Sequence, residues 1–163
     1  MNRIGSCLVL AGLLLVAAAG AALADDEYGR SYGVRIGYGS DPDQFVVGVQ
    51  ADMGQVYRNI RFVPSVDFGF GDHVNNIGFN GDFKAYLRLP RATAAFYFLA
   101  GPTIEIWNWD VAGIDNDTEI GVFLGGGVQM GLSDNGHYNL EARVGIGDVP
   151  EFRILLGVLF GGR

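Results

Sequence analysis

One stretch of the sequence decides the fold: Gln44-Phe45-Val46-Val47-Gly48-Val49-Gln50-Ala51-Asp52-Met53. Its odd-numbered positions are all apolar, and its even-numbered positions after Val46 are polar or glycine. Successive side chains of a β-strand point to opposite faces, so this stretch predicts a strand with one apolar face and one polar or narrow face.

Seven further stretches repeat this alternation, and short segments with turn composition separate them. One link contains Asn135-Gly136, a pair typical of a tight hairpin turn. Strands joined by short links pair with each other in sequence order, so we expect an all-β fold, an eight-stranded antiparallel up-and-down β-barrel. The expected strands are 32–38, 44–53, 60–70, 77–89, 96–106, 119–132, 138–146 and 152–160.

The first residues have the composition of a cleaved targeting segment. Arg3 precedes an apolar block from Leu8 to Leu23, and Ala22-Leu23-Ala24 gives a small-residue cleavage site before acidic residues. The alternative, a membrane-spanning helix, needs about 20 apolar residues followed by stop-transfer charges. Here the apolar block from Leu8 to Leu23 is shorter, and acidic residues follow it. We therefore expect a secretory signal peptide at 1–24 and one barrel domain at 25–163.

The composition of the remaining chain restricts its chemistry. The only cysteine, Cys7, lies in the expected signal peptide, so no disulfide and no thiolate chemistry are expected after cleavage. Loss of Arg3 leaves 10 basic residues against 18 acidic ones, and this negative charge argues against nucleic acid as a partner. The 26 glycines are too many for a helical protein and have no collagen-like period.

The alternation is compatible with two opposite barrels. A transmembrane barrel turns its apolar face to lipid and its polar face inward, whereas a soluble lipocalin-like barrel encloses an apolar cavity for a ligand. Glycines such as Gly125 and Gly127 crowd the polar face, and small residues make room inside a narrow barrel. Aromatic residues near the ends of the apolar face, such as Tyr38 and Phe160, match the girdles of membrane barrels. Both features favour the lipid-facing alternative.

The charges on the polar face balance, six basic against six acidic. Buried charges must be paired, because an unpaired charge in a protein interior is strongly destabilising. The balance therefore predicts an ionic network that fills the barrel interior and leaves a polar lumen that does not conduct. Its expected members are Arg35, Asp52, Arg61, Asp67, Asp82, Lys84, Arg88, Glu105, Glu119, Glu141, Arg143 and Arg153.

With these features, the chain resembles the small outer-membrane β-barrel family, the OmpA/OmpX-like group. The resemblance rests on the signal segment, the strand count, the glycine-rich sixth strand at 119–132, the Leu132-Ser133-Asp134 turn and the terminal amphipathic strand. It implies a porin-like transmembrane barrel in a bacterial-type outer membrane, in contact with outer-membrane lipid, with both termini on the periplasmic side. A soluble periplasmic barrel that binds an apolar ligand is the alternative.

In that orientation the outer turns carry acidic residues and neither lysine nor arginine. The acidic outer rim consists of Asp41, Asp43, Asp72, Asp110, Asp115, Asp117, Asp148 and Glu151. Two interpretations are open: a solvated edge that resists aggregation, or a surface that recruits divalent cations or a cationic partner. The spacing lacks the glycine and the register of an EF-hand loop, so we expect no specific metal site and no cofactor.

The sequence argues against an enzyme. The only histidines, His73 and His137, fall in connections at opposite ends of the expected barrel. A hydrolase needs a nucleophile, a base and an orienting acid within hydrogen-bond reach of one another. We therefore expect a structural or surface-interaction role.

Two further residue pairs give local expectations. Trp107 and Trp109 flank the longest expected loop, where anchoring at the membrane interface is favoured over ligand stacking. Pro64 and Pro102 lie within expected strands, where proline removes a hydrogen bond of the ladder. We expect a β-bulge at each proline, with a weakened seam in the barrel as the alternative.

Overall fold

The structure is a computed structural model that describes residues 30–72, 74–88, 94–109, 117–133 and 136–161. The expected signal peptide at 1–24 and the rim residues Asp110 and Asp115 lie outside the described residues, as do the side chains of Arg88 and Trp109. In the described part of the chain, no helix is long and apolar enough to span a membrane.

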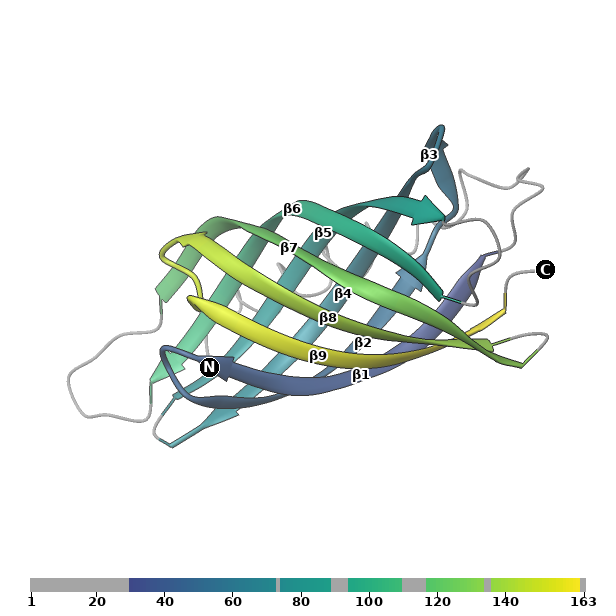
Figure 1. The fold of residues 1–163 in the computed structure, drawn as a ribbon. Coiled ribbons are helices and arrows are strands. Elements are labelled where there is room, and N and C mark those ends of the chain that lie inside the picture. Colours follow the sequence, from purple (N-terminus) through teal and green to yellow (C-terminus); the bar gives the residue numbers. More distant parts are fainter. Residues whose placement is uncertain (1–29, 73, 89–93, 110–116, 134–135, 162–163) are drawn as a thin grey trace.

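The described fold is a closed antiparallel β-sheet (Figure 1). Its strands are β1 (Ser31–Ser40), β2 (Gln44–Asp52), β3 (Gln55–Tyr57), β4 (Ile60–Gly71), β5 (Val74–Arg88), β6 (Ala94–Trp109), β7 (Asp117–Ser133), β8 (Gly136–Gly147) and β9 (Phe152–Gly161). β1 pairs with β9 and β2 pairs directly with β4, so eight strands close the wall and β3 is an addition to it. The prediction of an eight-stranded antiparallel up-and-down barrel is confirmed.

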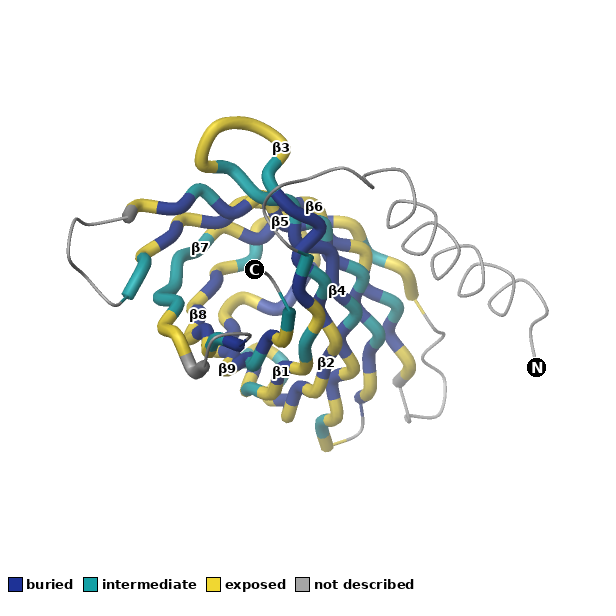
Figure 2. The backbone as a smooth tube through the Cα atoms, turned by 90° about the vertical axis from the view of Figure 1, so that its right-hand side faces the viewer, coloured by how far each residue is buried: buried dark blue, intermediate teal, exposed yellow. Residues whose placement is uncertain are grey.

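β3 lies where the sequence indicated only a connection between two strands. It pairs with the start of β4, with Gln55 opposite Arg61 and Tyr57 opposite Ile60. Residues 53–60, called here the β3 hairpin, stand out from the barrel wall (Figures 1 and 2). Three residues are too few to show a period, which explains why alternation does not reveal this strand.

Some strands continue beyond their apolar alternation. β5 begins at Val74 rather than at Ile77, so the loop expected at 71–76 is shorter. β6 continues to Trp109, beyond the expected end at residue 106. Asn75 and Asn76 pair with β4 in the same register as the apolar residues that follow them. A β-ladder is built from backbone groups, so it extends past the point where the outward side chains cease to be apolar.

The expectation of a β-bulge at each proline is wrong. Pro64 pairs with Gly81 in regular register, and it lies just beyond the last β2–β4 pair, where no partner strand requires its missing N–H. Pro102 pairs with Val122 of β7 in regular register. On its other side, the β5–β6 bridges pass from Asn80–Thr103 to Phe83–Ala100 without a change of register. The proline is therefore accommodated by a local gap in the ladder rather than by an inserted residue.

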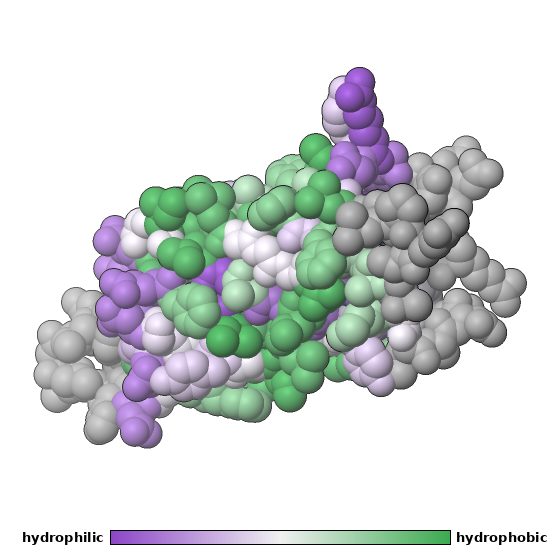
Figure 3. Space-filling model, in the orientation of Figure 1, coloured by the Kyte–Doolittle hydropathy of each residue, from purple (hydrophilic) through white to green (hydrophobic). Residues whose placement is uncertain are grey.

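Burial shows which side of the wall faces the interior. On β1, Val34 is 56% exposed and Ile36 is 47% exposed, whereas Arg35 between them is 1% exposed. The same alternation of buried and exposed positions follows the other strands (Figure 2), and the outward side chains form an apolar surface around the middle of the barrel (Figure 3). An apolar wall around a polar interior is the arrangement of a transmembrane barrel, and a lipocalin-like barrel has the reverse.

Candidate functional site

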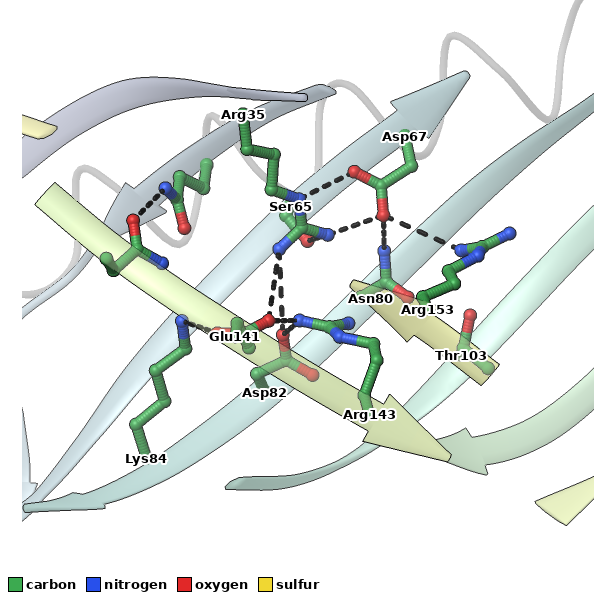
Figure 4. Close-up of polar contacts among 12 residues, drawn as sticks. Arg35, Ser65, Asp67, Asn80, Asp82, Lys84, Thr103, Glu141, Arg143 and Arg153 are labelled. Atoms are coloured by element: carbon green, nitrogen blue, oxygen red, sulfur yellow. Dashed lines mark hydrogen bonds and ion pairs between the residues drawn. The ribbon is translucent and has the colours of Figure 1, made fainter. Parts of the chain in front are cut away.

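The interior of the barrel holds a connected cluster of charged side chains (Figure 4). Arg35 of β1 donates to both carboxylate oxygens of Asp67 on β4, at 2.7 Å from Nε and 2.5 Å from Nη2. Its Nη2 also donates to the Ser65 hydroxyl at 2.6 Å. A two-pronged contact of this kind fixes the guanidinium plane as well as its position.

Glu141 on β8 binds side chains of β5 and β6 and an arginine of its own strand. Its carboxylate accepts from Lys84 Nζ at 2.6 Å and from the Tyr97 hydroxyl at 2.9 Å, and it also contacts the Arg143 guanidinium. Arg143 donates in turn to Asp82 at 2.9 Å. Arg35 Nη1 lies 4.0 Å from both Asp82 and Glu141, and this contact connects the group around Glu141 to the Arg35–Asp67 pair.

Arg153 on β9 links Asp67 to the remaining acid. Its Nη1 lies 3.0 Å from Glu105 and 3.7 Å from Asp67. Glu105 also accepts hydrogen bonds from the Asn76 amide and, at 3.3 Å, from the Thr103 hydroxyl. The contacts thus run without a break from Lys84 to Glu105 across the lumen.

Together these residues form the central ionic cluster, which contains four bases and four acids. Its members are Arg35, Asp67, Asp82, Lys84, Glu105, Glu141, Arg143 and Arg153, and none is more than 2% exposed. Removing a charge from water is unfavourable unless partners and further hydrogen bonds compensate for the lost hydration. Equal numbers of both signs and the polar neighbours compensate for part of this cost inside the barrel, although several guanidinium nitrogens, such as Nη2 of Arg153, have no hydrogen-bond partner among the described residues.

The other expected members of the network lie elsewhere. Asp52 and Arg61 form a separate pair at 2.7 Å near the end of β2, where Arg61 is 13% exposed. Glu119 is half-buried beside the Trp107 indole, and no base lies within 4 Å of it among the described side chains. Trp107 is 4% exposed and points into the barrel, so the expectation that it anchors the protein at the membrane interface is wrong.

Glycines on the inner face provide the space that the cluster occupies. A Cβ atom added at Gly78 would lie 2.7 Å from both carboxylate oxygens of Glu105, and one added at Gly48 would collide with the Asp67 carboxylate. Contacts this close do not occur at real Cβ atoms. Interior glycines therefore determine where the long charged side chains can cross a narrow barrel.

Phe123 belongs to this site, although the sequence did not indicate it. The ring is fully buried and lies under two guanidinium groups, 5.3 Å from that of Arg143 and 5.2 Å from that of Arg153. Both distances suit cation–π attraction, which is strongest away from water. A lone aromatic residue among the inward-facing glycines of β7 was the signal that could have identified it.

The turn between β8 and β9 folds into the mouth of the barrel. Val149 is 7% exposed and packs so closely on β7 that a Cβ at Gly121 would lie 2.7 Å from it. The Gly145 amide donates to the Glu151 carbonyl at 2.9 Å, which holds the turn in place. Composition indicated a turn here, but nothing in the sequence showed that its apolar residue points inward.

The described members of the acidic outer rim lie at a single end of the barrel, where β1, β4, β6 and β8 end and β2, β5, β7 and β9 begin. These members, which are Asp41, Asp43, Asp72, Asp117, Asp148 and Glu151, are exposed. The Tyr38 hydroxyl donates to Asp43 at 2.5 Å. Within the described ranges, no three histidine, cysteine or acidic side chains lie close enough together to hold a metal ion.

Comparisons with known proteins agree with this architecture. No protein family model and no curated protein matches the chain. Among solved structures, the N-terminal β-barrel domain of OprF from Pseudomonas aeruginosa aligns with 14% identity over 82% of this chain and 96% of its own (TM-score 0.67). Neisserial surface protein A aligns with 13% identity over 83% and 97% (TM-score 0.63). The outer membrane protein Ail of Yersinia pestis aligns with 12% identity over 80% and 98% (TM-score 0.50). The likeness establishes the fold, which is that of small eight-stranded transmembrane β-barrels.

Proposed function

We propose that this protein is a small outer-membrane β-barrel whose lumen is closed by paired charges and whose role is structural or surface-interacting. One observation carries the proposal: an apolar exposed wall encloses an interior in which four buried bases and four buried acids neutralise one another. Lipid surrounds the apolar wall, and the charged side chains that face the interior neutralise one another there. The signal peptide expected from the sequence would deliver the chain to that membrane.

The closed lumen follows from the size of the barrel. Eight strands leave an interior just wide enough for side chains. Here the central ionic cluster spans that interior from the side of β1, β8 and β9 to the side of β4, β5 and β6, and Phe123 and Val149 pack beside it toward the outer end. We therefore propose that these side chains leave no continuous aqueous path through the barrel.

Electrical recording tests the closed lumen. The refolded protein, inserted in a planar bilayer, is expected to give no stable conductance step, while a large porin in the same bilayer serves as the positive control. Insertion is verified separately by the change in gel mobility that a folded barrel shows on heating in SDS. Large, long-lived conductance steps from verified barrels would refute the closed lumen.

The acidic outer rim suggests where a partner would act. We propose that it attracts divalent cations or a cationic partner through its collective field, because those of its side chains that the structure describes are exposed and do not converge on one point. We propose no catalytic role, since Lys84, Tyr97 and Glu141 bind one another inside the barrel. A soluble carrier of an apolar ligand needs an apolar interior, and no observation favours one.

A further inference from the structure

The β3 hairpin is the one part of the described chain that stands away from the barrel wall. It lies at the end opposite to the acidic outer rim and extends sideways beyond the strands rather than along the barrel axis (Figures 1 and 2). A segment in that position would meet the surface of a membrane that surrounds the barrel.

The hairpin is held firmly at both ends. At its base, Met53 N donates to Phe62 O at 2.9 Å and Phe62 N donates to Gly54 O at 3.1 Å. At its far end, Asn59 exchanges two hydrogen bonds with the backbone of Tyr86 on β5, at 2.8 and 2.9 Å. The residues between these ties are therefore presented in a defined position.

These presented residues are amphipathic. Val56 is 46% exposed and Tyr57 is 60% exposed. Arg58 is also exposed and lies over the Tyr57 ring, with its guanidinium carbon 5.3 Å from the ring centre. Among the described side chains, no carboxylate lies within 4 Å of this guanidinium. The tip thus combines an apolar surface with a positive charge that is not neutralised by a described acid.

The backbone at the tip is strained. Arg58 has a φ of 45°, in the left-handed region that non-glycine residues seldom adopt. Strain at an exposed residue persists only where the surrounding structure enforces it, and it is frequent at binding positions. Here the residue lies in the tight turn between β3 and β4, the two ties of the hairpin hold this turn in place, and the Arg58 side chain packs against Tyr57.

The apolar wall of the barrel reaches the foot of the hairpin. Phe62 on β4 and Phe83 on β5 have their ring centres 5.1 Å apart. Leu87 on β5 is 48% exposed and lies two residues beyond the partner of Ile60, the last residue of the hairpin. The polar tip therefore lies directly beside apolar wall, as the surface view shows (Figure 3). A phospholipid has the same arrangement, with a charged headgroup next to acyl chains.

We infer that the β3 hairpin is a binding site for the headgroup of an anionic phospholipid in the leaflet at this end of the barrel. Arg58 donates to the phosphate, and its planar guanidinium suits that oxygen geometry. Tyr57 and Val56 lie at the boundary between headgroup and acyl chains, where an apolar body with a polar edge is favourable. This inference rests on the proposed function, because it needs the barrel to span a membrane.

Lipid competition tests the site. A fluorophore is attached to the Val56→Cys variant of the mature chain, which has no other cysteine. Its quenching is measured in mixed vesicles that contain either brominated phosphatidylglycerol or brominated phosphatidylcholine. The binding constant of the site for phosphatidylglycerol is expected to exceed that for phosphatidylcholine by about fivefold, and Arg58→Gln is expected to make the two nearly equal. Arg30→Gln, a half-buried arginine that precedes β1 at the same end, is the matched control and should keep the preference.

The outcomes separate the inference from the proposed function. If the barrel inserts but aqueous iodide quenches the fluorophore and brominated lipid does not, the lipid site is refuted while the membrane barrel stands. An equal loss of preference in Arg58→Gln and Arg30→Gln also refutes it, because general surface charge then explains the selectivity. A protein that does not insert into vesicles at all refutes the proposed function, and the inference with it.

Discussion

Arg143 of β8 and Arg153 of β9 lie directly opposite each other, and both guanidinium groups pack against the ring of Phe123. Like charges in a facing pair are normally destabilising. Here each arginine has an acidic partner of its own, Asp82 at 2.9 Å for Arg143 and Glu105 at 3.0 Å for Arg153. The electron-rich ring of Phe123 lies 5.3 Å from one guanidinium carbon and 5.2 Å from the other, and it attracts both cations. The two arginines are therefore stable neighbours only within the complete cluster.

Phe123→Leu tests the role of the ring. The change keeps an apolar side chain but removes the aromatic face from two buried cations, so we expect the free energy of unfolding to fall by about 2–3 kcal/mol. Urea unfolding in lipid vesicles measures it. Phe98→Leu is the matched control, because Phe98 is 66% exposed on the outer wall. The free energy of unfolding of this variant should fall by about 0.5 kcal/mol or less. Equal losses in the two variants would show that the ring has no special role.

Replacement of Arg143 and of Arg61, two arginines of the expected ionic network, should have different effects. Arg143→Met leaves Asp82 and Glu141 short of a buried partner, and a loss of about 3–5 kcal/mol in unfolding free energy is expected. Arg61→Met breaks a pair at the barrel end where water has access, so we expect a loss of about 1 kcal/mol.

A double variant distinguishes lost charge pairing from lost packing at Arg143. Asp82→Asn added to Arg143→Met removes one of the unpaired acids and should recover part of the stability, as a double-mutant cycle would measure. If the double variant is as unstable as the sum of the single variants, the two side chains are not coupled and the cluster description is incorrect.

Arginine scanning along β9 tests whether lipid surrounds the wall. Leu156 is 47% exposed near the middle of the strand, and Phe160 is 58% exposed near its end. Leu156→Arg is expected to destabilise the inserted barrel by about 2–4 kcal/mol and Phe160→Arg by about 0–1 kcal/mol, because the penalty depends on depth in the bilayer. Losses that do not depend on position along the strand would point to water around the wall.

Neutralisation of the β8–β9 turn tests the acidic outer rim. Asp148→Asn with Glu151→Gln removes two exposed charges without touching the central ionic cluster. Binding of a lysine-rich peptide to the inserted protein should weaken by several-fold at low salt, and the difference should largely disappear near 1 M salt, where screening is strong. This result distinguishes a rim that attracts a cationic partner from a rim that is only a solvated edge, because unchanged peptide binding would leave only the solvated edge.

The period of the sequence was sufficient to place every barrel strand and to assign its faces. It placed Arg35, Asp67 and Glu141 on one side of the wall, and the structure buries all three. Alternation reports the face of a residue but not its height along the barrel axis. Height depends on the stagger between strands, which explains why Arg61 and Arg143 have the same sequence signal and lie in different environments.

Other parts of the site depend on contacts that no period encodes. Val149 points into the barrel because Gly121 and Gly145 leave room for it, and these residues lie on strands that the turn meets only after folding. Trp107 was assigned to the interface from its residue type, whereas its position in the inward series of β6 would have placed it inside. Residue type was the weaker guide there.

Cell fractionation followed by electrophoresis tests the central claim most directly. The full-length protein is expressed in a bacterium, and its mature band is run in SDS with and without prior heating. We predict that the band is found in the outer-membrane fraction and changes mobility on heating, as a closed barrel embedded in lipid does. A mature band in the soluble periplasmic fraction whose mobility does not change on heating would contradict a membrane-spanning barrel.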